Sequence, residues 1–281
     1  MKLEKALLKK LIFHVIAFSI GILWLIPFLG VFMASIRPFD EIFRGWWTFD
    51  RFTLTFNSYI GAWNDPVYPL SRGLLNSFIV AIPSTIIPLF VGALAGYGFA
   101  RFNFRIKSYL FLTVVFLMAL PQQSVIVPLF QIMNNLRLID NYLSLILVHS
   151  AWGLPWIILF LRNFFSTLPI EIEEAARIDG ASDFKIFRKI VLPMSLPALA
   201  SVVVLQFMWV WNDFFLAKVL IYEESMLLAT QRVEYIGREA FRVNWGVLTA
   251  GSIIVMIVPI IIFVLLQRYY VKGMIGWTVK G

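Results

Sequence analysis

Long apolar runs separated by short polar segments make up most of the chain. Each run is long enough to cross a bilayer as a helix, which takes roughly 20 residues. Helices are expected because hydrocarbon offers no partner to an open backbone. The pattern predicts six crossings, at residues 11–35, 74–100, 108–130, 143–161, 196–221 and 247–266. We therefore expect an all-α integral membrane protein that crosses the membrane several times.

Polar segments divide the predicted helices into three parts. Residues 1–36 hold a lysine-rich start and the first crossing, whose apolar run is longer than the roughly 7 to 15 residues of a secretory signal. Residues 37–72 are rich in aromatic side chains, which are typical of a membrane interface, and we expect an external segment there. Residues 73–281 form the core, with the other five crossings, loops at about 163–193 and 222–246, and a polar C-terminal tail.

The charged residues favour one orientation in the membrane. With both termini in the cytoplasm, 15 of the 24 lysines and arginines and 6 of the 16 acids lie inside. The cytoplasmic side then carries a net charge of +9 and the external side −1, in agreement with the positive-inside rule. The loop at 163–193 and the C-terminal tail are therefore expected inside, and the loop at 222–246 outside.

Composition narrows the classes of function. The chain has 281 residues, 60% of them hydrophobic and 14% charged, with a mean hydropathy of +0.83, which a water-soluble domain does not need. The net charge of +8 is spread over short loops beside apolar runs, so membrane lipid is an expected partner and nucleic acid is not. Zero cysteines and two histidines leave little for a metal site or a thiol nucleophile. We expect neither a catalytic residue nor a bound metal.

Small residues and prolines interrupt the predicted second to fourth crossings. Glycines gather at Gly92, Gly96 and Gly98, and the fourth crossing contains Gly153 and Pro155. Close packing of helices is the favoured interpretation, because small residues let two backbones approach each other. A hinge is the alternative.

The loop at 163–193 begins with the pattern of a short helix that ends in a turn. Pro169 suits the first helical turn, and Glu171, Glu173 and Glu174 place negative charge at the positive end of the helix. Gly180 suits the left-handed conformation that ends a helix, and Ser182 can cap the next one.

A second short helix is expected after Ser182. It should expose its lysines and arginines and end at Leu192 and Pro193. The residues expected to be buried on its other side are Phe184, Phe187 and Val191. From the pattern alone, an amphipathic loop lying on the bilayer surface is an equal alternative.

The spacing within this loop resembles a known motif. Glu174-Ala175-Ala176, followed by Gly180, Ile190 and Leu192-Pro193, resembles the EAA loop of ABC-importer permeases, which docks into a cleft of the cytoplasmic ATPase subunit. The resemblance implies a coupling role for a set of residues around the motif. These are Glu173, Glu174, Ala175, Ala176, Asp179, Gly180, Leu192 and Pro193.

The length, the six crossings, the EAA loop and the glycine-containing C-terminus together resemble the smaller permease subunit of carbohydrate ABC importers of the maltose and glycerol-phosphate type. The resemblance implies a type I ABC-importer permease fold in the inner membrane of a prokaryote. It also implies a sugar or oligosaccharide as cargo, with a peptide or glycerol phosphate as the alternative. The tail from Gly273 to Gly281 is similar to one that reaches between the ATPase subunits.

The same resemblance implies several partners. These are a homologous second permease, two ABC ATPase subunits and an extracytoplasmic solute-binding protein that contacts the loop at 222–246. ATP and Mg²⁺ are expected in the ATPase subunits, because this chain contains no Gly-x4-Gly-Lys-Ser/Thr sequence. We expect no cofactor on this chain.

Polar side chains inside the predicted crossings are costly in hydrocarbon, so they are candidates for a solute pathway. Gln206, Trp209 and Asp213 share one helical face, with Asn212 beside them. Amide, carboxylate and aromatic ring suit the hydroxyl groups and faces of a sugar. Further candidates are Gln122, Gln123, His149 and Trp152. The alternatives are an interfacial position for Trp209 and Asp213, and a hydrogen bond between helices for His149.

Two other classes fit the sequence less well. A secondary carrier is expected to show inverted repeats and ionisable groups at the membrane midplane, and no Lys, Arg or acid lies deep in a predicted crossing. A membrane enzyme needs a nucleophile or a metal cluster, whereas only isolated polar residues occur here. We therefore expect a transport subunit and not an enzyme.

Overall fold

The computed structural model describes residues 2–238 and 243–278, and the side chains of residues 9–238 and 243–268. Within these ranges the chain is helical apart from turns and an isolated bridge between Arg238 and Val243. The long helices are α1 (Lys2–Ser35), α4 (Leu70–Arg101), α5 (Lys107–Leu117), α6 (Gln122–Asn135), α7 (Tyr142–Thr167), α11 (Leu196–Trp211) and α14 (Trp245–Thr278). Residues 239–242 of the predicted external loop and 279–281 of the predicted tail lie outside the described residues.

Shorter helices connect the long ones. Those outside the loop at 163–193 are α2 (Phe39–Ile42), α3 (Asn57–Trp63), α12 (Phe215–Leu220), the 3-10 turn η2 (Glu224–Met226) and α13 (Ala229–Tyr235). Those inside it are α8 (Ile170–Ile178), α9 (Asp183–Ile186), the π-helical turn η1 (Phe187–Val191) and α10 (Leu192–Met194). The chain divides into two compact units, one of Met1–Ser71 and Arg232–Met256, the other of Arg72–Gln231 and Ile257–Gly281.

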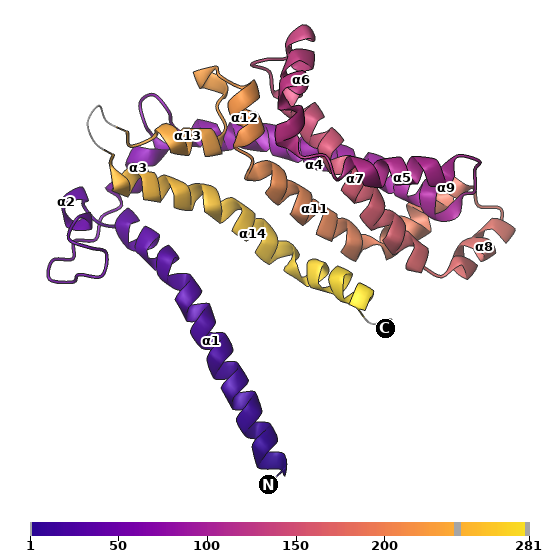
Figure 1. The fold of residues 1–281 in the computed structure, drawn as a ribbon, viewed down its shortest axis with the longest axis horizontal. Helices are drawn as coiled ribbons and strands as arrows, with labels where there is room; N and C mark the ends of the chain where they lie inside the picture. Colours follow the sequence, from indigo (N-terminus) through magenta and orange to yellow (C-terminus); the bar gives the residue numbers. More distant parts are fainter. Residues whose placement is uncertain (1, 239–242, 279–281) are drawn as a thin grey trace. The chain divides into compact units, whose positions relative to one another are not determined.

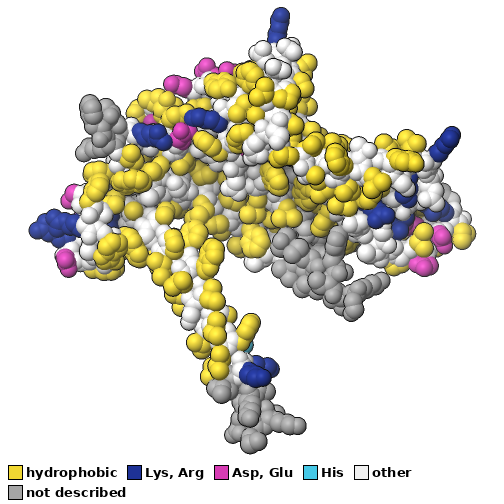
Figure 2. Space-filling view, in the orientation of Figure 1, with side chains coloured by type: hydrophobic (Ala, Val, Ile, Leu, Met, Phe, Trp, Pro, Cys, Tyr) yellow, Lys and Arg dark blue, Asp and Glu magenta, His cyan; other side chains and the backbone are white. Residues whose placement is uncertain are grey.

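The first unit contains α1 and the aromatic segment that follows it. Large apolar side chains of α1 are exposed from Leu11 to Phe32, and Figure 2 shows them along the helix, as expected of a helix surrounded by lipid. In the next segment the buried Arg37 donates from Nη2 to the Thr48 carbonyl at 2.7 Å, and its guanidinium lies 4.8 Å from the centre of the Phe52 ring. These contacts with the Arg37 guanidinium stabilise the irregular segment that follows α1.

A carboxylate also stabilises the same segment. Glu41 accepts a hydrogen bond from the backbone N–H of Thr53 at 3.1 Å. Hydrogen bonding by Thr53 lowers the pKa of Glu41, because it favours the charged carboxylate.

The second unit is built on three helices, α4, α7 and α11, which lie side by side (Figure 1). Their approach is close where small residues face a neighbour. A Cβ added at Gly92 would lie 2.5 Å from Cγ2 of Ile157, and one added at Gly96 would lie 3.1 Å from the backbone nitrogen of Arg162. The prediction of close packing at these two glycines is confirmed, whereas a Cβ at Gly98 would meet nothing within 4 Å.

The predicted crossings agree with the helices in part. Four helices are long and apolar enough to cross a membrane: Lys9–Ser35, Leu70–Arg101, Tyr142–Thr167 and Trp245–Arg268. The third predicted crossing is instead a bent pair, because α5 and α6 meet at 100° around Pro121. The total reaches six if this pair and a second pair, Asp183–Met194 with Leu196–Trp211, each count as one crossing.

The predicted fifth crossing, at 196–221, is wrong in its extent. The helix α11 ends at Trp211, and the side chain of Asn212 donates to the carbonyl of Met208 at 2.8 Å. The Asp213 carboxylate then accepts from the backbone N–H groups of Leu216, at 3.4 Å, and Ala217, at 3.1 Å. Because Asp213 satisfies the first N–H groups of α12, the chain starts a new helix there instead of continuing the old one.

Gly96 provides a test of the packing between α4 and α7. We expect Gly96→Val to destabilise the purified protein by about 1–3 kcal/mol, because the added atoms overlap the backbone of α7. Thermal unfolding in detergent measures the effect. Gly98→Val is the matched control, two residues along the same helix and open to space. Equal melting temperatures for the two variants would contradict the close approach.

Candidate functional site

The turn after α8 has a defined local structure. Gly180 has φ +79°, and its N–H donates to the Arg177 carbonyl at 3.0 Å. The N–H of Ala181 donates to the Ala176 carbonyl at 2.9 Å, which completes a Schellman motif. Ser182 then caps α9, its hydroxyl accepting from the N–H of Lys185 at 3.4 Å. Both predictions for Gly180 and Ser182 are confirmed.

Most of the residues assigned to coupling are accessible. Glu174, Ala175, Asp179 and Gly180 are exposed, and Ala176 is half-buried. We call Glu174, Ala175, Ala176, Asp179 and Gly180 the docking face, after the role that the resemblance implies; of these, Ala176 also packs against the buried cluster. Leu192 is partly buried and Pro193 is exposed, both on α10.

The helix after the turn differs from expectation in two ways. Phe187 and Val191 are buried as predicted, but Phe184 is 62% exposed, because it belongs to the first turn of α9 beside the projecting loop, and Ile186 is buried in its place. The helix also passes through Leu192 and Pro193, since a proline at the start of α10 needs no N–H partner there. It ends at Ser195, whose hydroxyl donates to the Val191 carbonyl at 2.7 Å.

Glu173 points into the protein and not outward. It is 1% exposed, and its carboxylate accepts from the Arg101 Nε at 2.8 Å and from the Tyr97 hydroxyl at 2.9 Å. By contrast, Arg177 and Asp183 form an ion pair on the surface, with Arg177 Nε 3.0 Å from Asp183 Oδ1. The Arg177 side chain is 39% exposed and the Asp183 side chain 49%. The hydrogen bond to Asp183 raises the pKa of Arg177, which keeps this guanidinium charged.

Gln206 joins three helices of the second unit. Its Nε2 donates to the carbonyls of Ser84, at 3.1 Å, and His149, at 3.2 Å, and its Oε1 accepts from the indole N–H of Trp156 at 3.1 Å. Gly153 makes room for it, because a Cβ there would lie 2.5 Å from Gln206 Nε2. The amide is 2% exposed, so its hydrogen bonds are made within the protein in this conformation.

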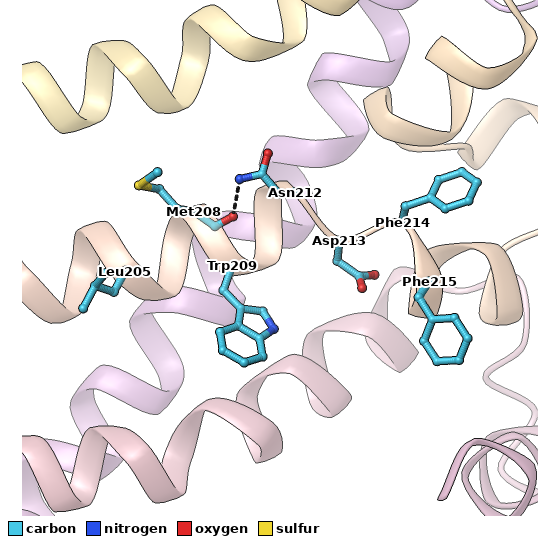
Figure 3. Close-up of a pocket in the computed structure, with 7 residues that line it drawn as sticks. All are labelled: Leu205, Met208, Trp209, Asn212, Asp213, Phe214 and Phe215. Atoms are coloured by element: carbon cyan, nitrogen blue, oxygen red, sulfur yellow. Dashed lines mark hydrogen bonds between the residues drawn. The ribbon is translucent and has the colours of Figure 1, made fainter. Parts of the chain in front are cut away.

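Trp209, Asn212 and Asp213 line an open cavity of about 590 Å³ (Figure 3). Trp209 is 56% exposed and projects to the same side of the chain as Asp213 and Phe215, whereas Asn212 and Met208 project to the other side. His149 is fully buried next to Asp213. Its Nε2 lies 3.6 Å from the Asp213 carboxylate and has no hydrogen-bond partner. The cavity is lined by three aromatic side chains, Trp209, Phe214 and Phe215, beside one acidic residue.

Comparison with known proteins identifies the family. The model of the family described as "Binding-protein-dependent transport system inner membrane component" matches residues 88–276. The chain belongs to this family. It is the permease subunit of an ABC importer, a multi-pass protein of the inner membrane and not an enzyme.

Named relatives extend over most of the permease. A probable ABC transporter permease of Pyrococcus horikoshii is 57% identical over 95% of this chain and 96% of its own. The GgtD permease for osmoprotective compounds of Synechocystis is 38% identical over 97% and 93%. The AglG permease of an α-glucoside transport system of Rhizobium meliloti is 42% identical over 75% of this chain and 57% of its own.

A solved structure supports the fold of the permease. A bacterial ABC transporter for import of the acidic polysaccharide alginate contains a chain that matches with a TM-score of 0.76, over 92% of this chain and 96% of that one, at 24% identity. The predicted type I ABC-importer permease fold is confirmed. The cytoplasmic position of both termini stays a prediction.

The structure gathers some of the pathway candidates and separates others. His149, Trp152, Gln206 and Trp209 line one small enclosed cavity. Trp152 also lines an apolar cavity of about 230 Å³ with Leu117. Gln122 and Gln123 begin α6, after the bend, and neither lines the cavity of Figure 3. Among the described residues no group of three His, Cys, Asp or Glu side chains is placed to hold a metal.

Sequence reasoning did not find Tyr97 and Arg101 as partners of Glu173. Arg101 ends an apolar helix and was counted only as a positive charge on the cytoplasmic side. The signal available was weak, since Arg101 lies 72 positions from Glu173. Pattern along a single helix cannot pair residues so far apart.

The left-handed turn of the permease generates a second prediction. Gly180→Val should lower solute uptake per ATP hydrolysed several-fold, because a β-branched residue at positive φ is strained by roughly 1–2 kcal/mol and shifts the docking face. Uptake and ATP hydrolysis by the assembled importer measure this ratio.

Gly180→Asn is the matched control for that variant. Asparagine tolerates the left-handed conformation, and a Cβ at this position meets nothing within 4 Å, so coupling should be largely retained. Normal coupling in the valine variant would show that the turn does not position the docking residues.

Proposed function

We propose that this permease pairs with a homologous permease and two ATP-hydrolysing subunits, and moves a sugar or oligosaccharide inward after delivery by an extracytoplasmic binding protein. The observation that carries the proposal is the docking face. It presents Glu174-Ala175-Ala176 beside the rigid turn at Gly180, exposed at the end of a buried helical core. Exposed small residues beside a rigid turn leave room for the close approach of another protein.

The buried core beneath the docking face supports a mechanical role. Tyr97, Phe165, Phe187 and Val191 belong to one cluster of buried side chains that also includes residues of α7 and α11. Well-packed interiors transmit displacement because they deform little. ATP-driven closure of the partner subunits would therefore shift the helices between two arrangements, open to one side of the membrane or the other. ATP and Mg²⁺ would be held by those subunits.

The cavity of Figure 3 supports a carbohydrate as cargo. Trp209 offers an exposed ring for the apolar face of a sugar, whereas the Asp213 carboxylate beside it is 8% exposed and already accepts from two backbone N–H groups. The α-glucoside system to which AglG belongs agrees with this class of cargo. An osmoprotective compound is the second candidate, because the GgtD relative matches over nearly the whole chain.

The assembly itself is testable by purification and reconstitution. The tagged permease, extracted in mild detergent, should bring with it a second permease and an ATPase subunit, identified by mass spectrometry. In proteoliposomes, the complex with its binding protein should take up labelled glucosides or oligosaccharides only when ATP is supplied. Uptake that follows an ion gradient without ATP would contradict the proposal. Preference for an osmolyte over every glycoside would show that the cargo is not a carbohydrate, while ATP-driven import by the proposed complex would still hold.

Trp209 tests the solute pathway. Trp209→Ala should raise the KM for uptake roughly three- to tenfold, in line with the loss of one aromatic contact of about 0.5–1.5 kcal/mol. Trp209→Phe keeps a ring and should lie near the wild type. Asp213→Ala, expected from sequence to alter transport without altering assembly, also removes the cap of α12, so Trp209 is the cleaner probe. An unchanged KM over a series of sugars would remove Trp209 from the pathway.

A further inference from the structure

Glu173 differs from the other acids of α8. Glu171 and Glu174 are exposed, whereas Glu173 is 1% exposed and has both carboxylate oxygens bonded to α4. Oε1 accepts from Arg101 Nε at 2.8 Å, and Oε2 accepts from the Tyr97 hydroxyl at 2.9 Å. The charge is thus paired and hydrogen-bonded within the protein, as a buried carboxylate requires.

Arg101 extends the link to a third helix. Its Nη2 donates to the carbonyl of Leu168, the residue that ends α7, at 2.9 Å. Arg101 belongs to the last turn of α4. Its guanidinium therefore joins α4 to the end of α7 and to the first turn of α8 at the same time. The Arg101 side chain is 7% exposed, so water competes little for these bonds.

Apolar contacts hold α8 poorly by comparison. Its large apolar side chains face outward: Ile170 is 43% exposed, Ile172 42% and Ile178 88%. The Tyr97 ring, in contrast, lies in the buried cluster, 5.0 Å from the Phe187 ring and 6.2 Å from the Phe165 ring. The polar contacts of Glu173 are accordingly the main attachment of α8 to α4.

Buried ion pairs are seldom needed for stability, because apolar residues of similar volume often stabilise a protein as well. What a charge-assisted pair supplies is direction, since its hydrogen bonds fix two elements at one distance and angle. A helix that receives force from a partner needs such a fixed attachment. Glu173 and Glu174 are neighbours in sequence, so the buried attachment and the exposed residues Glu174 and Ala175 lie within one turn of one short helix.

We propose that Arg101 and Glu173, assisted by Tyr97, are positioning residues that tie α8 to the inner end of α4 and pass its displacement to the solute pathway. The proposal rests on the proposed function. From Arg101, α4 runs roughly 25 Å, at 1.5 Å per residue, to Ser84. The Ser84 carbonyl accepts from Gln206 of α11, the helix that carries Trp209. The contacts form a continuous line from the docking face to the cavity of Figure 3.

The test compares two arginines of the same cytoplasmic segment in the complete, reconstituted importer. Arg101→Gln and Glu173→Gln should each lower the solute transported per ATP hydrolysed at least fivefold. Arg105→Gln makes the same chemical change at an exposed position and should leave the ratio unchanged. The double variant Arg101→Gln with Glu173→Gln should be no worse than either single one, because both remove one link.

A second readout separates positioning from assembly. The chain has no cysteine, so Ala175→Cys can be cross-linked selectively to a cysteine placed in the ATPase subunit. We expect this cross-link to persist in Arg101→Gln while transport per ATP falls. A parallel decline of ATP hydrolysis and uptake in the assembled complex, at an unchanged ratio, would mean a structural role only and overturn the proposal.

Tyr97→Phe keeps the test decisive if the charge variants do not assemble. It removes one hydroxyl and keeps the ring in the cluster, and transport per ATP should fall about twofold. Wild-type coupling in Tyr97→Phe, together with unassembled charge variants, would also overturn the proposal. If the unmutated complex shows no ATP-driven uptake, the proposed function itself is wrong. If the unmutated complex does show ATP-driven uptake and the variants keep its transport per ATP, only the proposed role of Arg101 and Glu173 is wrong.

Discussion

Hydrocarbon provides no hydrogen-bond partners, and this constraint explains the structure at each level. Backbone groups are satisfied inside helices, so the long apolar runs of the described chain are helical. Where a helix stops, a side chain takes over, as Asp213 does for the first N–H groups of α12. Among the buried polar side chains, Gln206 meets the same requirement with three partners on two other helices, whereas His149 Nε2 has no partner.

Small residues and polar side chains act together in holding the second unit. Without a strong hydrophobic driving force between helices in lipid, close backbone approach and hydrogen bonds between helices provide the specificity. Gly153 shows both effects, because its missing side chain leaves the space that the Gln206 amide occupies. The same contact lies directly behind Trp209, so the packing of the bundle and the shape of the pathway cavity depend on one another.

The loop at 163–193 combines a rigid turn with a directional attachment. The Schellman turn at Gly180 fixes the exposed residues, and the buried carboxylate of Glu173 fixes the helix that carries them. The π-helical turn η1 follows, packed into the buried cluster through Phe187 and Val191. π-Helical turns are frequent at functional sites, and here one lies along the chain between the Schellman turn at Gly180 and α11.

The sequence by itself determined the membrane class, the approximate crossings, the left-handed turn at Gly180 and the docking motif. Each of these depends on neighbours along the chain: apolar run length, charge beside a crossing, or residue spacing within one turn. Only the tertiary structure decided that α11 ends at Trp211, that Phe184 faces outward, and that Glu173 binds Arg101. The first two depend on local turns and caps, such as Asp213 at the start of α12, which a hydrophobic period does not resolve. The third joins residues 72 positions apart, and a periodic pattern within one helix carries no information about its neighbour.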